Sequence, residues 1–274
     1  MKRIKLTFAQ KNRKEIDVLR QITIRDISSK YKGSKLGFVW TVINPIIMLS
    51  VYTIIFSEVF QAKWGTTGTS YEEVDKAAFA LNLFCGLTIF NIFGESIGRA
   101  PTLIINNPNY VKKIRFPLEA LGEMTVLSAL FNGISNLTVI CIAVVITTGK
   151  LHLGIALIPI IWLPLILVCL GATWIVSVAG VYIRDMSQII NAAISCMLFL
   201  SPVFYPTDAL PEKMRWLAQI NPIAITIEQT RNLVLEGRLP SLHVVIGMIL
   251  LGIAWCEMCF AILKNSQGHI SDRL

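Results

Sequence analysis

Long runs of apolar residues alternate with short polar stretches over most of the chain. A helix that crosses a bilayer needs about 20 largely apolar residues, and six segments meet this requirement. They are residues 36–60, 77–97, 124–148, 158–183, 187–204 and 243–263. Pro45 and Pro164 fall inside two of these segments, where lipid-embedded helices tolerate kinks. The pattern predicts an all-α integral membrane protein with six transmembrane helices.

Two longer polar segments are predicted to lie at the membrane surfaces. In residues 1–35, apolar residues such as Ile16, Leu19 and Ile22 are spread among charges, which indicates a helix on the inner leaflet. Residues 205–242 contain two short helical patterns, "LPEKMRWLAQI" and "NPIAITIEQTRNLVLEG". Asn221 is the expected N-cap of the second, with Pro222 at its first position and Gly237 at its end. Neither pattern is apolar for long enough to cross.

Composition agrees with a membrane protein. Hydrophobic residues make up 54% of the chain, charged residues only 15%, and the mean hydropathy is +0.63. The first 35 residues contain no apolar core of a cleavable signal peptide. We therefore expect a single transmembrane domain, residues 1–274, which ends in a polar tail at 264–274.

The charge distribution predicts the orientation. Of the Lys and Arg residues, 18 fall on the side of the two termini and 7 on the other side. By the positive-inside rule both termini should be cytoplasmic. The same rule explains the net charge of +8, so nucleic acid is not an expected partner.

The sequence offers little support for an enzyme. It lacks a phosphate-binding loop of the Gly-x-x-x-x-Gly-Lys-Ser/Thr type, and its three histidines are scattered. All six cysteines lie in apolar segments, so Cys256 and Cys259 are interpreted as packing residues and not as a disulfide or metal site. We expect no catalytic residues, no metal site and no cofactor in this chain.

A basic segment with a proline near each end, "NNPNYVKKIRFPLEAL" (residues 106–121), interrupts the apolar pattern between the second and third predicted spans. Val111, Ile114 and Leu118 recur at helical spacing, and Lys112, Lys113 and Arg115 would give such a helix a cationic face. A helix that transmits force and a basic loop held at lipid headgroups both fit the residues alone.

Two stripes of side chains occur at helical spacing within the predicted spans. The stripe in the first span is aromatic. The stripe in the fifth span begins with polar residues and ends with an aromatic residue. Their residues are Tyr52, Phe56 and Phe60, and Ser187, Asn191, Ser195 and Phe199. Aromatic faces can stack on sugar rings, but ordinary helix packing explains such stripes equally well. Glu95 and Arg99, one turn apart, are interpreted as a local ion pair.

Four motifs follow one another along the chain. The first runs from Arg25-Asp26 through Lys30-Tyr31-Lys32 and Ser34 to Leu36-Gly37, Trp40 and Pro45. The others are "NPNYVKKIRFP", "YIRDMSQII" with "SPVFYP", and "INPIAITIEQTRNLVLEG". In this order the motifs resemble the ABC-2 family of exporter permeases, in the branch that exports O-antigen, capsule and teichoic-acid polymers.

This resemblance implies a permease of the bacterial inner membrane that exports a lipid-linked polysaccharide, with O-antigen the first expectation. It implies a homodimer with two copies of a separate ATPase, which would hold the ATP and magnesium. Alternatives that remain open are a capsule, teichoic-acid or small-molecule exporter, an ion-coupled secondary transporter, and a scaffold that transports nothing.

The resemblance also assigns roles to residues. The ATPase-coupling contact falls on Lys112, Lys113, Ile114, Arg115 and Phe116. The two stripes would line a channel. The short helices between the fifth and sixth spans would form a gate, with Tyr205, Trp216 and Arg231 as the gate residues.

Overall fold

The computed structural model describes residues 13–55, 72–111 and 116–271, and this part of the chain is helical apart from turns and short connections. The α-helices are α1 (Arg13–Lys30), α2 (Trp40–Ile54), α3 (Glu72–Gly98), α4 (Ala100–Leu103), α5 (Pro108–Val111), α6 (Glu119–Thr148), α7 (Ile158–Tyr182), α8 (Met186–Leu200), α9 (Glu212–Ile220), α10 (Pro222–Arg231) and α11 (Leu242–Ser271). Shorter turns are the 3-10 helices η2 (Gly37–Val39), η4 (Leu153–Leu157) and η5 (Thr207–Ala209), and the π-helix η6 (Asn232–Glu236).

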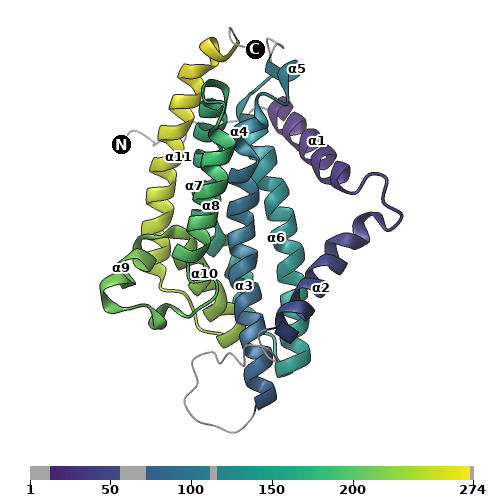
Figure 1. The fold of residues 1–274 in the computed structure, drawn as a ribbon, viewed down its shortest axis with the longest axis vertical. Coiled ribbons are helices and arrows are strands. Elements are labelled where there is room, and N and C mark those ends of the chain that lie inside the picture. The colour runs from purple at the N-terminus through teal and green to yellow at the C-terminus, as the bar shows by residue number, and fades with distance from the viewer. Residues whose placement is uncertain (1–12, 56–71, 112–115, 272–274) are drawn as a thin grey trace.

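A bundle of α3, α6 and α7 forms the centre of the molecule, and α11 packs along the outer side of α7 (Figure 1). Its core joins Leu83 and Ile89 of α3 to Ile140 of α6 and Leu165 of α7, all fully buried. In the most apolar stretch of the span that includes α3 and α4, 67% of the residues are buried, whereas in the span of η2 and α2 only 6% are buried. The second predicted span is therefore the central helix, and the first is peripheral.

Small residues let the bundle helices approach closely. A Cβ atom added at Gly180 of α7 would lie 2.0 Å from the carbonyl oxygen of Pro101 in α4. One added at Gly133 of α6 would lie 2.5 Å from Ile92 of α3. Close backbone contact at small residues is the usual way in which membrane helices associate.

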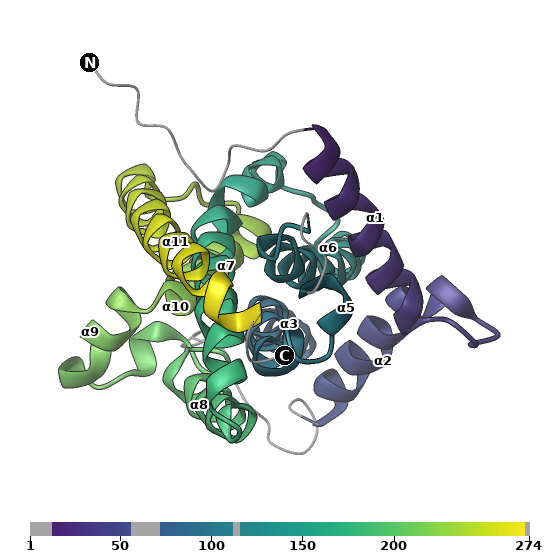
Figure 2. The same ribbon diagram turned by 90° about the horizontal axis from the view of Figure 1, so that it is seen from above.

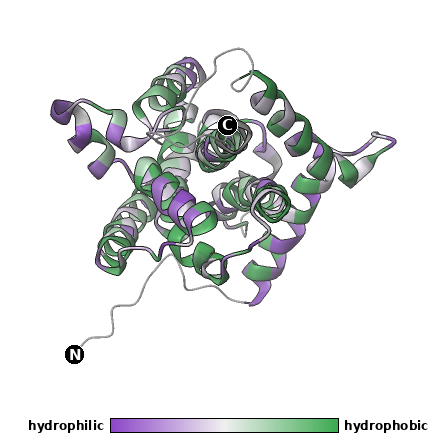
Figure 3. Ribbon diagram, turned by 90° about the horizontal axis from the view of Figure 1, so that it is seen from below, coloured by the Kyte–Doolittle hydropathy of each residue, from purple (hydrophilic) through white to green (hydrophobic). Residues whose placement is uncertain are grey.

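The all-α membrane architecture is confirmed. In the described part of the chain, five spans are long and apolar enough to cross a membrane: Gly37–Ile54, Ala78–Leu103, Glu119–Thr148, Leu153–Tyr182 and Leu242–Gly268. Hydrophilic residues concentrate on helices at the edge of the bundle (Figure 3). Much of the predicted polar tail at 264–274 continues α11 as helix.

The predicted fifth span is shorter than expected. It forms α8, which has 15 residues and is about 22 Å long at 1.5 Å per residue, less than the roughly 30 Å of a hydrocarbon core. The helix ends at Leu200, not Phe204, because Pro202 disfavours a helical conformation at Ser201, whose ψ is 143°. The sixth crossing therefore stays a prediction.

The two short helices of residues 205–242 are confirmed as α9 and α10. Asn221 caps α10 by accepting a hydrogen bond from the Ile223 amide at 2.9 Å. Gly237 ends the following π-helix with φ at 68°. Ile223 and Ile227 are fully buried against α3 and α7, so α10 inserts into the bundle and does not lie on its surface.

Candidate functional site

One end of the bundle joins α1, α4, α5 and the first turn of α6 (Figure 1). This end contains the described part of the basic segment 106–121. Lys112, Lys113, Ile114 and Arg115 lie outside the described residues. Phe116 and Pro117 are not helical, so the helical spacing of Val111, Ile114 and Leu118 does not correspond to one helix that continues to Leu118, and the coupling role of the segment stays a prediction. Pro117 restricts the preceding residue to extended conformations, which separates α5 from α6.

Aromatic stacking holds the two sides of this segment together. The rings of Tyr110 and Phe116 stack with their centroids 4.4 Å apart. Arg25 of α1 donates a hydrogen bond to the Tyr110 hydroxyl, and its guanidinium lies 5.6 Å from the centre of that ring. Ile22 of α1 packs into the same cluster with Leu103. The expected coupling segment is thus attached to α1.

Four charged side chains form ion pairs between α1 and the end of α3. Two lie on α1, one lies on α3, and the fourth is Arg99, the residue directly after α3. Asp26 and Lys30 lie one turn apart on α1, opposite Arg99 and Glu95. Arg99 donates two hydrogen bonds to Asp26, at 2.6 and 3.0 Å, and Lys30 pairs with Glu95. Glu95 also accepts a hydrogen bond from Asn132 of α6 at 2.8 Å. We call Asp26, Lys30, Glu95 and Arg99 the charge ladder.

The electrostatics favour the ionised form of Asp26. Burial alone would raise the pKa of Asp26, but hydrogen bonds from Arg99 and the nearby charges hold that pKa below its usual value. The predicted local pair of Glu95 and Arg99 is present at 3.9 Å, but both residues make closer contacts with α1. Sequence reasoning missed these long-range partners, although the one-turn spacing of opposite charges on both segments was a signal for them.

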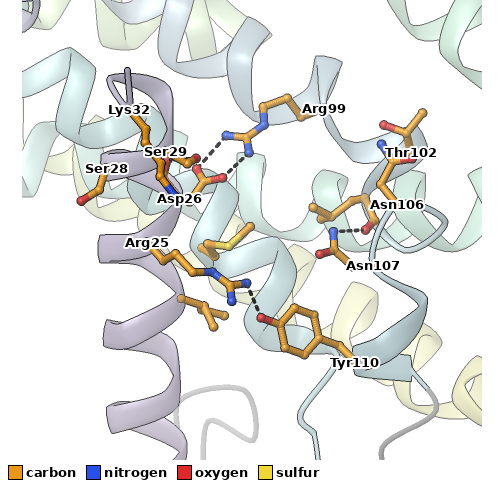
Figure 4. Close-up of a pocket in the computed structure, with 13 residues that line it drawn as sticks. Arg25, Asp26, Ser28, Ser29, Lys32, Arg99, Thr102, Asn106, Asn107 and Tyr110 are labelled. Carbon is orange, nitrogen blue, oxygen red and sulfur yellow. Dashed lines mark hydrogen bonds and ion pairs between the residues drawn. The ribbon is translucent and has the colours of Figure 1, made fainter. Parts of the chain in front are cut away.

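Next to the ladder is an open polar pocket of about 810 Å³ between α1 and the α4–α5 segment (Figure 4). Ser28 and Ser29 line it from α1, Lys32 from the turn that follows α1, and Thr102 and Asn106 from the facing segment. Among the described residues, no group of three or more acidic, histidine or cysteine side chains could hold a metal ion. A polar recess beside a basic segment can receive a protruding loop of a protein.

The two expected channel-lining segments lie on either side of α3 (Figure 2). Tyr52 of α2 is half-buried against the core, while Phe56 and Phe60 lie outside the described residues. On α8, Ser187 is half-buried, Asn191 and Ser195 are exposed, and Phe199 is 69% exposed. No residue of α8 is fully buried. Both helices therefore leave faces uncovered in a single chain.

The three expected gate residues have different surroundings. The Tyr205 hydroxyl donates to the Phe199 carbonyl at 2.8 Å, which connects it to the end of α8. Trp216 on α9 is 55% exposed. Arg231, at the end of α10, is only 6% exposed, and its guanidinium points into the protein.

Comparison with known proteins identifies this architecture. The model of the ABC-2 type transporter family matches residues 17–235. The chain belongs to the ABC-2 type transporter family. The matched region of this ABC-2 chain runs from α1 to the π-helix and so contains the charge ladder, the basic segment, α2 and α8.

Individual relatives match over most of their length. The "O-antigen export system permease protein RfbA" of Klebsiella pneumoniae is 26% identical over 81% of this ABC-2 chain and 82% of its own. A protein of the same name from Myxococcus xanthus is 23% identical over 91% of this chain and 92% of its own. The resemblance seen in the sequence motifs is thus confirmed along almost the whole chain.

Proposed function

We propose that this chain is the membrane permease of an ABC exporter that moves a lipid-linked polysaccharide, O-antigen in the first instance, across the bacterial inner membrane. The observation that carries this proposal is the match to permeases named for O-antigen export over more than four fifths of both chains. The permease itself is non-catalytic, and a separate ATPase supplies the energy.

The uncovered faces of α2 and α8 support a homodimer around a shared path. Apolar residues of α2 such as Ile46, Met48 and Ile54 are 48–60% exposed in the single chain. On α8 the exposed surface adds the Asn191 amide and the Phe199 ring. A second copy facing this side would enclose a passage with polar and aromatic walls, which suits a sugar chain that must slide and not bind tightly.

The contacts at the basic end provide a route for coupling. Movement of the segment around Phe116 would act through Tyr110 and Arg25 on α1. Two contacts stabilise the connection from α1 to α2. The ring centroids of Tyr31 and Phe38 lie 5.4 Å apart, and the Trp40 indole donates a hydrogen bond to the Ser34 hydroxyl at 2.9 Å. Force from an ATPase would therefore reach α2 through a continuous chain of contacts.

A gene deletion tests the function. Cells without this permease should accumulate lipid-linked polysaccharide on the cytoplasmic side and lose the polymer from their surface, and the wild-type gene should restore both. Analysis of the retained polymer distinguishes O-antigen from capsule or teichoic acid. Normal surface polymer in the deletion strain would refute the proposal.

A further inference from the structure

The end of α8 creates an unusual requirement for hydrogen bonds. The chain leaves the helix at Ser201 and continues as buried, non-helical backbone through Pro202 and Val203. Carbonyl groups in such a stretch have no helical partner and, within a membrane protein, little water to replace one. Non-helical backbone that is buried in a membrane protein persists only where other protein groups form the hydrogen bonds it needs.

Arg231 satisfies this backbone. Its Nη1 donates to the Pro202 carbonyl at 2.8 Å and its Nη2 to the Val203 carbonyl at 2.8 Å, while Nε donates to the Asn82 carbonyl of α3 at 2.9 Å. One planar guanidinium therefore joins α10, α3 and the end of α8. Gly86 leaves room for it, since an added Cβ would lie 2.7 Å from Nη2.

Two further contacts join α10 to the chain at the end of α8, and a third joins α10 to α7. Asn221, the cap of α10, donates to the Ser201 hydroxyl at 3.0 Å. Thr207, beyond the end of α8, donates to Glu228 of α10 at 3.0 Å. On the opposite side of α10, Trp162 of α7 donates to Thr230 at 3.2 Å.

The helix α2 is packed more loosely than α10. Pro45 is the one buried residue of α2.

We propose that Arg231 is a positioning residue that clamps the end of α8 and α10 to α3, and that this clamp stays closed throughout transport. This inference rests on the proposed function. The proposed role of Arg231 differs from that of the other expected gate residues. The Arg231 guanidinium holds the gate segment through buried backbone carbonyls and does not face the polymer. The passage must then widen by displacement of the loosely packed α2 against a fixed unit of α3, α8 and α10.

A cysteine pair tests whether the clamp stays closed. Ser201→Cys with Asn221→Cys, in a parent protein whose native cysteines are replaced, puts a disulfide where the two side chains already meet. Oxidation should leave polysaccharide export at the level of the parent. Loss of export on oxidation, with recovery on reduction, would show that α8 and α10 must separate and would overturn the proposal.

The same pair tests the role of Arg231. Arg231→Lys keeps the charge but cannot span three carbonyls, so export should fall about tenfold or more, which corresponds to the loss of one hydrogen bond to a charged group. With the cysteine pair added, oxidation should restore part of the export, because the disulfide replaces the contact between α10 and the end of α8 but not the hydrogen bond to Asn82 of α3. An Arg231→Lys protein that exports normally, or that gains no export when the disulfide forms, overturns the clamp.

A second readout separates this inference from the function on which it rests. Absence of polysaccharide export by the cysteine-free parent refutes the proposed function. The melting temperature of the purified permease still tests the clamp in that case: Arg231→Lys should lower it, and the disulfide should raise it again. An unchanged melting temperature in Arg231→Lys contradicts the clamp whatever the substrate is.

Discussion

At the scale of single residues, ionised side chains hold the amino-terminal helix to the bundle. Asp26 receives two hydrogen bonds from Arg99, and its side chain is 13% exposed against 35% for Arg99. Such a two-bond pair is geometrically more specific than a single contact, and partial burial limits its screening by salt. The pair therefore fixes α1 against the start of α4 at one register.

Reversal of the pair measures its contribution. Asp26→Arg or Arg99→Asp alone sets like charges against each other, and each should destabilise the protein by about 1–3 kcal/mol. The double variant should recover part of this loss; recovery stays incomplete because Lys30 and Glu95 then each face a like charge one turn away. Thermal unfolding and polymer export are the measurements.

A control and a pH series sharpen this experiment. The same reversal at Glu236 and Arg238, a pair with side chains 48% and 76% exposed, should change stability little. Since the folded pKa of Asp26 is lowered, its contribution is complete above the unfolded pKa and lost only as pH falls through the folded value. Neutral and mildly acidic buffers should therefore give the same result. Additive single effects would contradict the pairing.

At the scale of elements, hydrophobic periodicity predicted which segments are helical but not how each one packs. Asn221, Pro222 and Gly237 correctly predicted the limits of the helical segment formed by α10 and the π-helix, because capping is local chemistry. The depth of α10 in the bundle was not predictable, because it depends on Arg231 meeting carbonyls of residues 82, 202 and 203. The ladder was missed for the same reason: its partners are distant in sequence.

The segment between α5 and α6 is predicted to bind the ATPase. Arg115→Asp combined with Phe116→Ala removes a basic charge and the ring that stacks on Tyr110, while every membrane-spanning segment stays unchanged. The variant should insert into the membrane but fail to co-purify with the ATPase. Lys150→Asp, beyond the far end of α6, is the matched control and should bind normally. Normal ATPase binding by the double variant would favour a basic loop held at headgroups.

The exposed ring of Phe199 is predicted to contact the polymer. Phe199→Leu keeps most of the apolar volume, and such swaps commonly cost less than about 1.5 kcal/mol even in cores. Export should fall while protein level and dimer formation stay unchanged, and Phe199→Trp should retain export because it keeps an aromatic face. Leu200→Ile, at the adjacent exposed position, serves as the control. Normal export by the leucine variant would remove Phe199 from the passage.

At the scale of the whole molecule, the two ends of the bundle differ in chemistry. The helices α1, α4 and α5, which carry residues of the charge ladder and the pocket, lie at one end with the carboxyl-terminal end of α11, and α9 and α10 lie toward the other end (Figure 1). Lys264 near the end of α11 pairs with Glu119 at 2.7 Å, which joins the tail to the first turn of α6. The structure thus fixes which segments share a side, and the distribution of Lys and Arg predicts which side is cytoplasmic.

Cysteine labelling in intact cells tests this orientation. Glu236→Cys, at the end of the π-helix, should react with a membrane-impermeant thiol reagent, because its side of the bundle is predicted to face outward. Gln267→Cys, on the last turns of α11, should react only after the cells are opened. The cysteine-free parent controls for background. Both positions belong to the same bundle, so the opposite labelling pattern would show that the whole protein has the reverse orientation in the membrane. It would place the basic segment outside, where no ATPase could reach it, and the coupling route through Phe116, Arg25 and α1 would have to be abandoned.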